Sequence, residues 1–269
     1  MKKLVLILFV LSLTNLFSQS DTTFFRLGST KFIVFTDTSV SVKKHTEKYK
    51  GHLASVTVGV NSLNIVEKNN ITTIDAPQPQ EGTILSKTAL ELDQARAWEF
   101  GFSVMEFNFG LYDNRMGIST GLGFNFNNYR FKNNYRIYNI EDKVVSALDT
   151  VYNFRKSKMT ISTIKIPLIF EYQSKKNKKD KRLFYINVGV FASYNMAQHM
   201  KYVYDRNGEK IKEKNYETFH LNPFQYGVTA RMGIGFLEIY AEYNISEMFK
   251  KNDDLQVNQF SVGVVLLDF

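Results

Sequence analysis

The chain has 269 residues, no cysteine, a formal net charge of +8 and an aromatic content of 14%. Without cysteine it cannot form disulfides, bind a metal through thiolates or use a cysteine nucleophile. The densest basic run, SKKNKKDKR at 174–182, has no interleaved aromatic residue for base stacking, so we expect no nucleic-acid partner.

The first twenty residues have the features of a secretory signal. Two lysines precede an apolar stretch at 4–13, and small or polar residues follow it. This stretch is too short for a membrane-spanning helix, which needs about 20 apolar residues. We therefore expect residues 1–20 to be removed by cleavage after Ser18 or Ser20, which changes the formal charge from +8 to +6.

Residues 21–47 form the next segment, and it has an alternation of its own through Phe32, Val34 and Thr36. This pattern predicts a short periplasmic hairpin or pairing with a partner. Because isolated hairpins are only marginally stable, a disordered leader is the other interpretation.

Eight later segments alternate apolar with small or polar residues, as strands with two different faces do. In MGISTGLGFNFN, at 116–127, the large apolar side chains share one face, and the other carries Gly, Ser and Asn. A change near Thr163 predicts a β-bulge. The eight segments lie at 53–61, 98–104, 116–127, 158–172, 182–196, 224–233, 237–246 and 256–269.

The connections between these segments alternate between long and short. Long ones at 62–95, 128–157 and 197–223 are separated by shorter ones, such as 110–115 and the turn at Gly235. Outer-membrane barrels have short periplasmic turns and long external loops. The sequence therefore predicts an all-β fold, an eight-stranded antiparallel up-and-down transmembrane β-barrel over 48–269, with both termini in the periplasm.

The composition of the two faces indicates which one is inside. The non-apolar rows are dominated by Gly, Ser and Asn, which suits a crowded lumen, so we expect the large apolar rows to face lipid. The charges expected in the lumen are Glu99, Lys165, Glu171, Arg231, Glu238 and Glu242. The aromatic residues expected to form girdles at the membrane interfaces are Trp98, Tyr112, Tyr129, Tyr172, Tyr194 and Tyr226.

Four stretches resemble the PorT-like outer-membrane β-barrel domain family. They are KYKGHLASVTVGVN at 48–61, GISTGLGFNFNNYRF at 117–131, KSKMTISTIKIPLIFEY at 156–172 and FHLNPFQYGVTARMGIG at 219–235. The similarity covers roughly 48–269 and implies an eight-stranded barrel in a Gram-negative outer membrane. It implies no catalytic activity.

The expected lumen charges have two interpretations. They form either a conduction or binding path, or a plug of mutually paired charges. Because side chains just fill the interior of an eight-stranded barrel, we expect the plug, with Tyr185, Phe191 and Tyr240 helping to fill the lumen.

The histidines are His45, His52, His199 and His220. An enzyme would use His199 or His220 near Ser193 and Asp205 at the external rim, but no catalytic motif surrounds them. The spacing of His45 and His52 does not indicate a metal site. We expect no catalytic residue, no metal and no cofactor.

These observations favour a structural or interaction scaffold over a narrow passive channel or a lipid-modifying enzyme. The expected partners are outer-membrane lipids and a protein bound through the long external loops or through 21–47. The loop at 133–156 is long, mixed in charge and rich in Tyr, and loops on a rigid scaffold commonly carry recognition.

Overall fold

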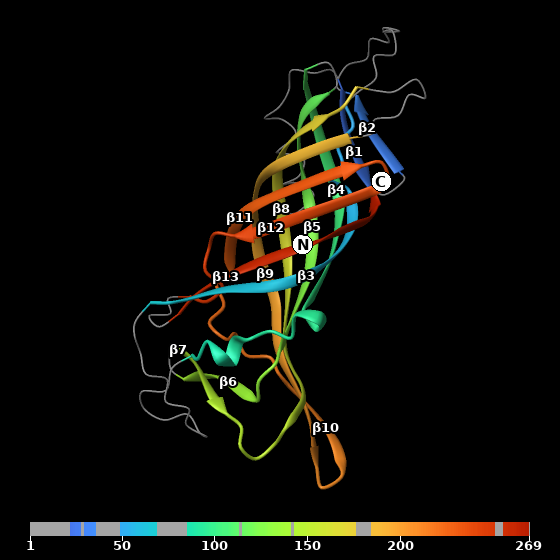
Figure 1. Ribbon diagram of the computed structural model, residues 1–269. Helices are drawn as coiled ribbons and strands as arrows, with labels where there is room; N and C mark the ends of the chain where they lie inside the picture. Colours follow the sequence, from blue (N-terminus) through green and yellow to red (C-terminus); the bar gives the residue numbers. More distant parts are fainter. Residues whose placement is uncertain are drawn as a thin grey trace, which may run out of the picture.

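The computed structural model describes residues 22–27, 30–35, 49–68, 85–112, 115–140, 143–175, 184–250 and 255–268, with only the backbone for 22–35 and residue 112 (Figure 1). The expected signal and the basic run from 176 onward lie outside the described residues. No helix within these ranges is both long and apolar enough to cross a membrane.

Eight antiparallel strands form a closed ring, as the alternating segments predict. They are β3 (Ser55–Glu67), β4 (Trp98–Tyr112), β5 (Met116–Phe131), β8 (Phe154–Gln173), β9 (Phe184–Arg206), β11 (Phe224–Ile234), β12 (Leu237–Asn244) and β13 (Leu255–Asp268). Each pairs with the next, and β13 pairs with β3 to close the ring. Closure satisfies the backbone N–H and C=O groups that lipid cannot satisfy.

The small and polar rows face the inside of the ring. In β11, Phe224 and Tyr226 are 69% and 59% exposed, whereas Gln225 and Arg231, on the opposite face, are 3% and 6% exposed. The same holds in β5, where Ser119 is fully buried. The large apolar side chains therefore form the outer surface, as the composition of the faces predicts.

Five further strands and two short helical turns lie outside this ring. β1 (Thr22–Leu27) and β2 (Thr30–Phe35) form a hairpin, which confirms that alternative for the first part of 21–47, and β1 pairs with β4. β6 (Tyr135–Ile140) and β7 (Lys143–Leu148) form a second hairpin, and β10 (Glu209–Asn215) folds back on β9. The 3-10 turns are η2 (Thr88–Leu90) and η3 (Gln94–Arg96).

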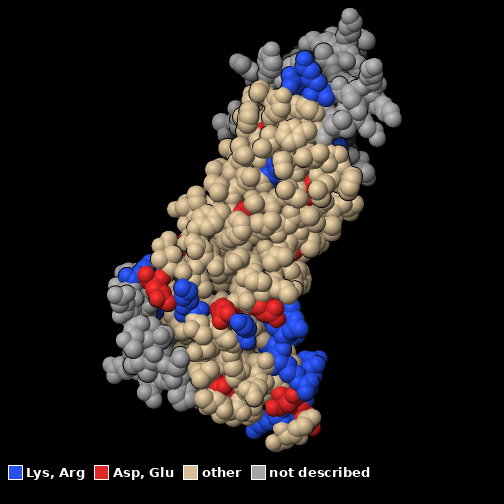
Figure 2. Space-filling view, viewed as in Figure 1, with Lys and Arg blue, Asp and Glu red and all other residues tan. Residues whose placement is uncertain are grey.

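The barrel has two different ends (Figure 1). The turn end carries β1, β2 and the end of β13, and the loop end carries β6, β7 and β10. On the face drawn in Figure 2, the middle of the molecule is a belt almost free of charged residues, and Lys, Arg, Asp and Glu gather at the loop end.

The outward side chains of β8 show where this belt ends toward the loop end. From Ile164 toward the turn end, apolar residues face outward, whereas beyond Ser162 the outward positions are polar and Met159 and Ile161 are fully buried. The β8–β9 pairing shifts at this level: Ser162 faces Ala197 and Thr163 faces Asn195. A bulge therefore lies at the level expected near Thr163, but the extra residue is in β9, and the alternation of burial along β8 is unbroken.

Beyond this limit the barrel continues as a structure that we call the head, formed by the described parts of 85–97, 127–161, 197–223 and 245–257. A hydrophobic core fills it. Its fully buried members include Leu85, Leu90, Met159, Ile161, Met200, Phe219 and Met248. The polarity of the strands reverses here because water, rather than lipid, surrounds the outer face.

Candidate functional site in the barrel interior

The chain segment 49–54, which precedes β3, enters the lumen at the turn end. Tyr49 and Leu53 in this segment are 8% and 2% exposed. Glycines of β5 make room for them: a Cβ at Gly117 would overlap the Tyr49 ring, and one at Gly121 would crowd Leu53. The glycine face of β5 thus receives an inserted segment, which we call the plug.

Glu171 of β8 holds the centre of the plug. This fully buried carboxylate accepts a hydrogen bond from the His52 backbone N–H at 3.2 Å and lies 2.7 Å from His52 Nδ1. Gln173 Nε2 donates to the Lys50 carbonyl at 2.6 Å and also to Glu171. Buried polar atoms need such partners, so these contacts fix the path of the plug.

Two further charged residues hold the end of the plug. Glu106 accepts a hydrogen bond from the Ala54 N–H at 3.0 Å, and Arg231 donates to Ser55 Oγ at 2.9 Å and to the His52 carbonyl at 3.5 Å. Within the described residues Arg231 forms no ion pair with a carboxylate, which contradicts its expected place among mutually paired charges. It is instead surrounded by backbone and hydroxyl acceptors.

Glu238 also belongs to the turn end. It accepts a hydrogen bond from the Tyr185 hydroxyl at 2.9 Å, and the Tyr185 ring stacks on the His52 ring, with centroids 4.1 Å apart. Tyr185 therefore fills the lumen beside the plug, in agreement with the expectation from its position in β9.

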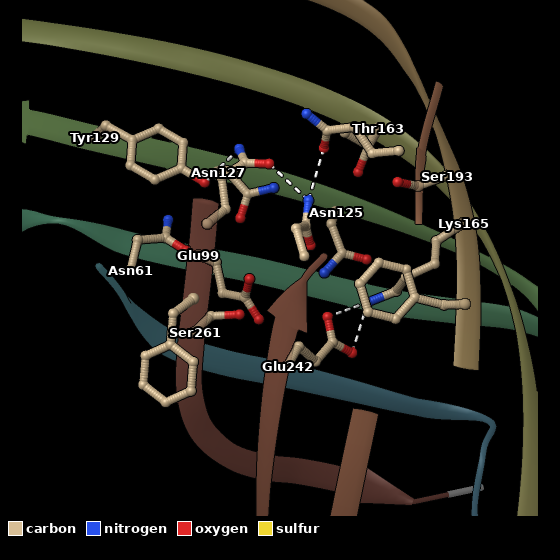
Figure 3. A pocket seen from close by; sticks show the side chains of 15 residues that line it. Asn61, Glu99, Asn125, Asn127, Tyr129, Thr163, Lys165, Ser193, Glu242 and Ser261 are labelled. Carbon is tan, nitrogen blue, oxygen red and sulfur yellow. Dashed lines mark hydrogen bonds and ion pairs between the residues drawn. The ribbon is translucent and has the colours of Figure 1, made fainter. Parts of the chain in front are cut away.

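A polar cavity occupies the middle of the barrel (Figure 3). Lys165 Nζ lies 2.7 and 2.6 Å from the two carboxylate oxygens of Glu242, and both residues are less than a tenth exposed. Glu99, which is 2% exposed, accepts a hydrogen bond from the Tyr240 hydroxyl. The free space for water centres is about 30 Å³, which is room for about two water molecules.

The predicted lumen charges thus lie inside the barrel, but they do not form one network. Five of the six are buried and Glu238 is partly buried, whereas only Lys165 and Glu242 pair with each other. The expectation of mutual pairing is wrong for the other four. Glu99 lines the same cavity as Lys165 and Glu242 but pairs with Tyr240, whereas Glu171, Arg231 and Glu238 lie toward the turn end. The six positions from Lys165 to Glu171 span about 20 Å along a strand.

The head closes the loop end of the lumen and is held together by Arg136 of β6. Its guanidinium contacts Asp149 and Glu213 at 2.7 and 2.8 Å and lies over the Tyr202 ring, 5.0 Å from the centroid. Burial alone would raise the pKa of Asp149, but hydrogen bonds from Arg136 and from the backbone N–H of Tyr152 outweigh it and lower that pKa.

The comparison with known protein families agrees with this architecture. The family described as outer membrane protein beta-barrel domain matches residues 17–250. The chain belongs to this family. It is therefore a protein of the outer membrane, where lipid covers its apolar belt.

None of the curated proteins compared with this barrel matches it. Among solved structures, it is similar to the crystal structure of Ail, the attachment invasion locus protein of Yersinia pestis, in complex with the heparin analogue sucrose octasulfate. The two share 12% identity with a TM-score of 0.31, over 79% of this chain and 96% of Ail.

Of the five described side chains expected in the aromatic girdles of this outer-membrane barrel, four lie on the outer face and one does not. Trp98, Tyr194 and Tyr226 are 47%, 43% and 59% exposed on the outer face, and Tyr172 is partly buried beside Arg115. The side chain of Tyr112 lies outside the described residues.

Tyr129 is the exception, because it points into the barrel. It is 1% exposed, and its hydroxyl oxygen accepts a hydrogen bond from Gln259 Nε2 at 2.7 Å. The physical reason is its place in β5, two and four positions after the inward Asn127 and Asn125 (Figure 3). The alternation in the sequence contains this information.

The rim residues considered for catalysis are not brought together. Ser193 lines the central cavity, whereas His199, six positions along β9 and about 20 Å away, packs against Tyr216. Asp205 pairs with Arg155 at 2.5 Å. Among the residues that the structure describes, no three His, Asp or Glu side chains are grouped to hold a metal.

Proposed function

We propose that this outer-membrane protein is a recognition scaffold, in which a non-conducting barrel anchors a rigid head on the outer side of the membrane. The observation that carries this proposal is the closure of the described lumen at both ends, by the plug and by the core of the head. The central cavity between these two barriers has room for only about two water molecules.

The head supplies the surface for recognition. Its contacts around Arg136 join β6, β9 and β10, so the exposed side chains are presented on a fixed frame. Val151 and Tyr216 are 72% and 68% exposed on this frame. Exposed apolar and aromatic side chains on rigid loops are common anchors of protein interfaces.

Two measurements test the proposal. In planar lipid bilayers the protein should produce no discrete conductance steps, and steps would favour the narrow-channel alternative. A photo-crosslinker placed at Tyr216 in intact cells should form a discrete protein adduct, while the same group at the lipid-facing Val188 should not. Adducts at neither position would argue against a protein partner of the head.

The finer assignments are also proposals. We propose that the chain is a PorT-like barrel, on the basis of the four stretches described above, and that residues 1–20 are a cleaved signal. We further propose that 21–47 lies in the periplasm and serves as a second contact for a partner. The intact mass of the protein from purified outer membranes checks the cleavage site, after Ser18 or Ser20.

A further inference from the structure

Four cations lie side by side across four strands on the outer face of the head. In the pairing register Arg130 of β5 faces Lys158 of β8, Lys158 faces Lys201 of β9, and Lys201 faces Lys214 of β10. We call these four residues the basic row. Like charges directly opposite each other in a sheet are destabilising, so the row is unfavourable unless an anion lies against it.

The charges around the row do not neutralise it. Within the described residues none of the four cations is within ion-pair distance of a carboxylate; Lys158 donates to Asn128 Oδ1, and Arg130 donates to the Arg155 carbonyl. Glu213, the acid nearest in β10, is paired with Arg136.

More lysines extend the positive surface. Residues at alternate positions of a strand share a face, so Lys212 lies on the same face of β10 as Lys214. Val203 of β9 pairs with Lys156 of β8 on one side and with Lys212 of β10 on the other. These two lysines lie one step further from the membrane than the basic row. Figure 2 shows Lys and Arg gathered at this end of the molecule.

The height of the row above the membrane indicates its ligand. The last outward apolar residue of β5 is Phe126, and Arg130 is four positions further along. Four residues rise about 13 Å along the strand, or about 10 Å along the axis of a tilted strand. Polar headgroups add about 5 to 7 Å to each side of the hydrocarbon core, so the row lies just above this layer, within reach of the long Lys and Arg side chains.

We propose that the basic row binds the phosphate groups of a phosphorylated glycolipid in the outer leaflet. A lipid is favoured over a soluble anion because Trp98, an interfacial aromatic residue, lies beside the row, 6.0 Å from Lys158 Nζ. Ammonium and guanidinium groups donate charge-assisted hydrogen bonds to phosphate oxygens, and a row of them spans more than one phosphate.

The test uses the full chain in neutral detergent, with bisphosphorylated lipid A and its enzymatically dephosphorylated form as probes. The double variant Lys158→Gln and Lys201→Gln should bind the phosphorylated probe about thirtyfold more weakly. A control that removes two other exposed lysines of the head, Lys87→Gln with Lys143→Gln, should bind it like the wild type.

A second variant separates binding from structure. Lys158→Glu places an acid between Arg130 and Lys201, so it should raise thermal stability in neutral detergent while abolishing binding of the phosphorylated probe. Equal binding of both probes by the wild type would overturn the proposal. The proposal would also be overturned if the variants lost binding of a soluble sulfated polysaccharide but still bound the phosphorylated lipid. The proposed scaffold function is tested by conductance, which does not depend on the basic row, whereas the row is tested by binding of the lipid probe. Either proposal can therefore fail while the other holds.

Discussion

The ion pair in the central cavity gives the sharpest prediction about stability. Replacing Lys165 with Met keeps an unbranched side chain one atom shorter, but it removes the ammonium group that contacts both oxygens of Glu242 and lies 5.3 Å from the centroid of the Phe191 ring. Glu242 and Glu99 then share a cavity that holds no cation among its lining residues.

The magnitude follows from burial. The side chains of Lys165 and Glu242 are 11% and 9% exposed, so the remaining carboxylate keeps little contact with water. Removing one partner of a buried pair costs about 3 to 5 kcal/mol in the free energy of unfolding. The second change Glu242→Gln should recover most of this loss, because it removes the unpaired charge.

Urea titration of the barrel in lipid vesicles, followed by Trp98 fluorescence, measures these free energies. Lys132→Met is the matched control: Lys132 pairs with Glu91 at 2.8 Å, but the two side chains are 61% and 49% exposed, so the free energy of unfolding should change little. A Lys165→Met barrel as stable as the control, or a double variant no better than the single one, would refute the reasoning.

Three further predictions concern the head and the plug. Arg136→Met should cost about 2 to 4 kcal/mol and expose β6 to proteases, because it leaves Asp149 and Glu213 without their cation; unchanged cleavage would contradict this. Since the folded pKa of Asp149 is lowered, its stabilisation is present above the ordinary pKa and is lost as pH falls through the folded value. Pepsin cleavage of the head should therefore increase below about pH 4, and an Asp149→Asn variant should lack this increase. Glu171→Gln should speed amide hydrogen exchange of His52 relative to the head, and equal rates would argue against a carboxylate anchor for the plug.

The strands and their facing were predictable because alternation is a local property. Alternate residues in 224–233 share a face, so the sequence already shows which side chains lie together. The abundance of Gly, Ser and Asn then indicates which face is enclosed. The prediction for Tyr129 was wrong because nearness to the strand end does not determine the face of a side chain. Its position four residues after Asn125 does, and it places Tyr129 on the inner face.

The insertion of residues 49–54 into the lumen and the formation of the head were not predicted, and the reasons differ. The insertion of 49–54 depends on contacts with Gly117 and Glu171, which are far away in the sequence, so no local pattern reveals it. The head has a local signal: along 156–172 the apolar face changes sides. A bulge within 158–172 would produce the same change, so the pattern alone does not distinguish a bulge from the passage from lipid to water that the structure shows.

The central claim is that lipid surrounds the apolar rows while the opposite rows face a closed axis. Because the chain has no cysteine, a single spin label can be attached at Val188→Cys, with Val151→Cys in the head as the control. In lipid vesicles the label at 188 should collide with oxygen far more often than with a water-soluble nickel chelate, and the label at 151 should show the reverse. Access of the nickel chelate to position 188 would contradict the account.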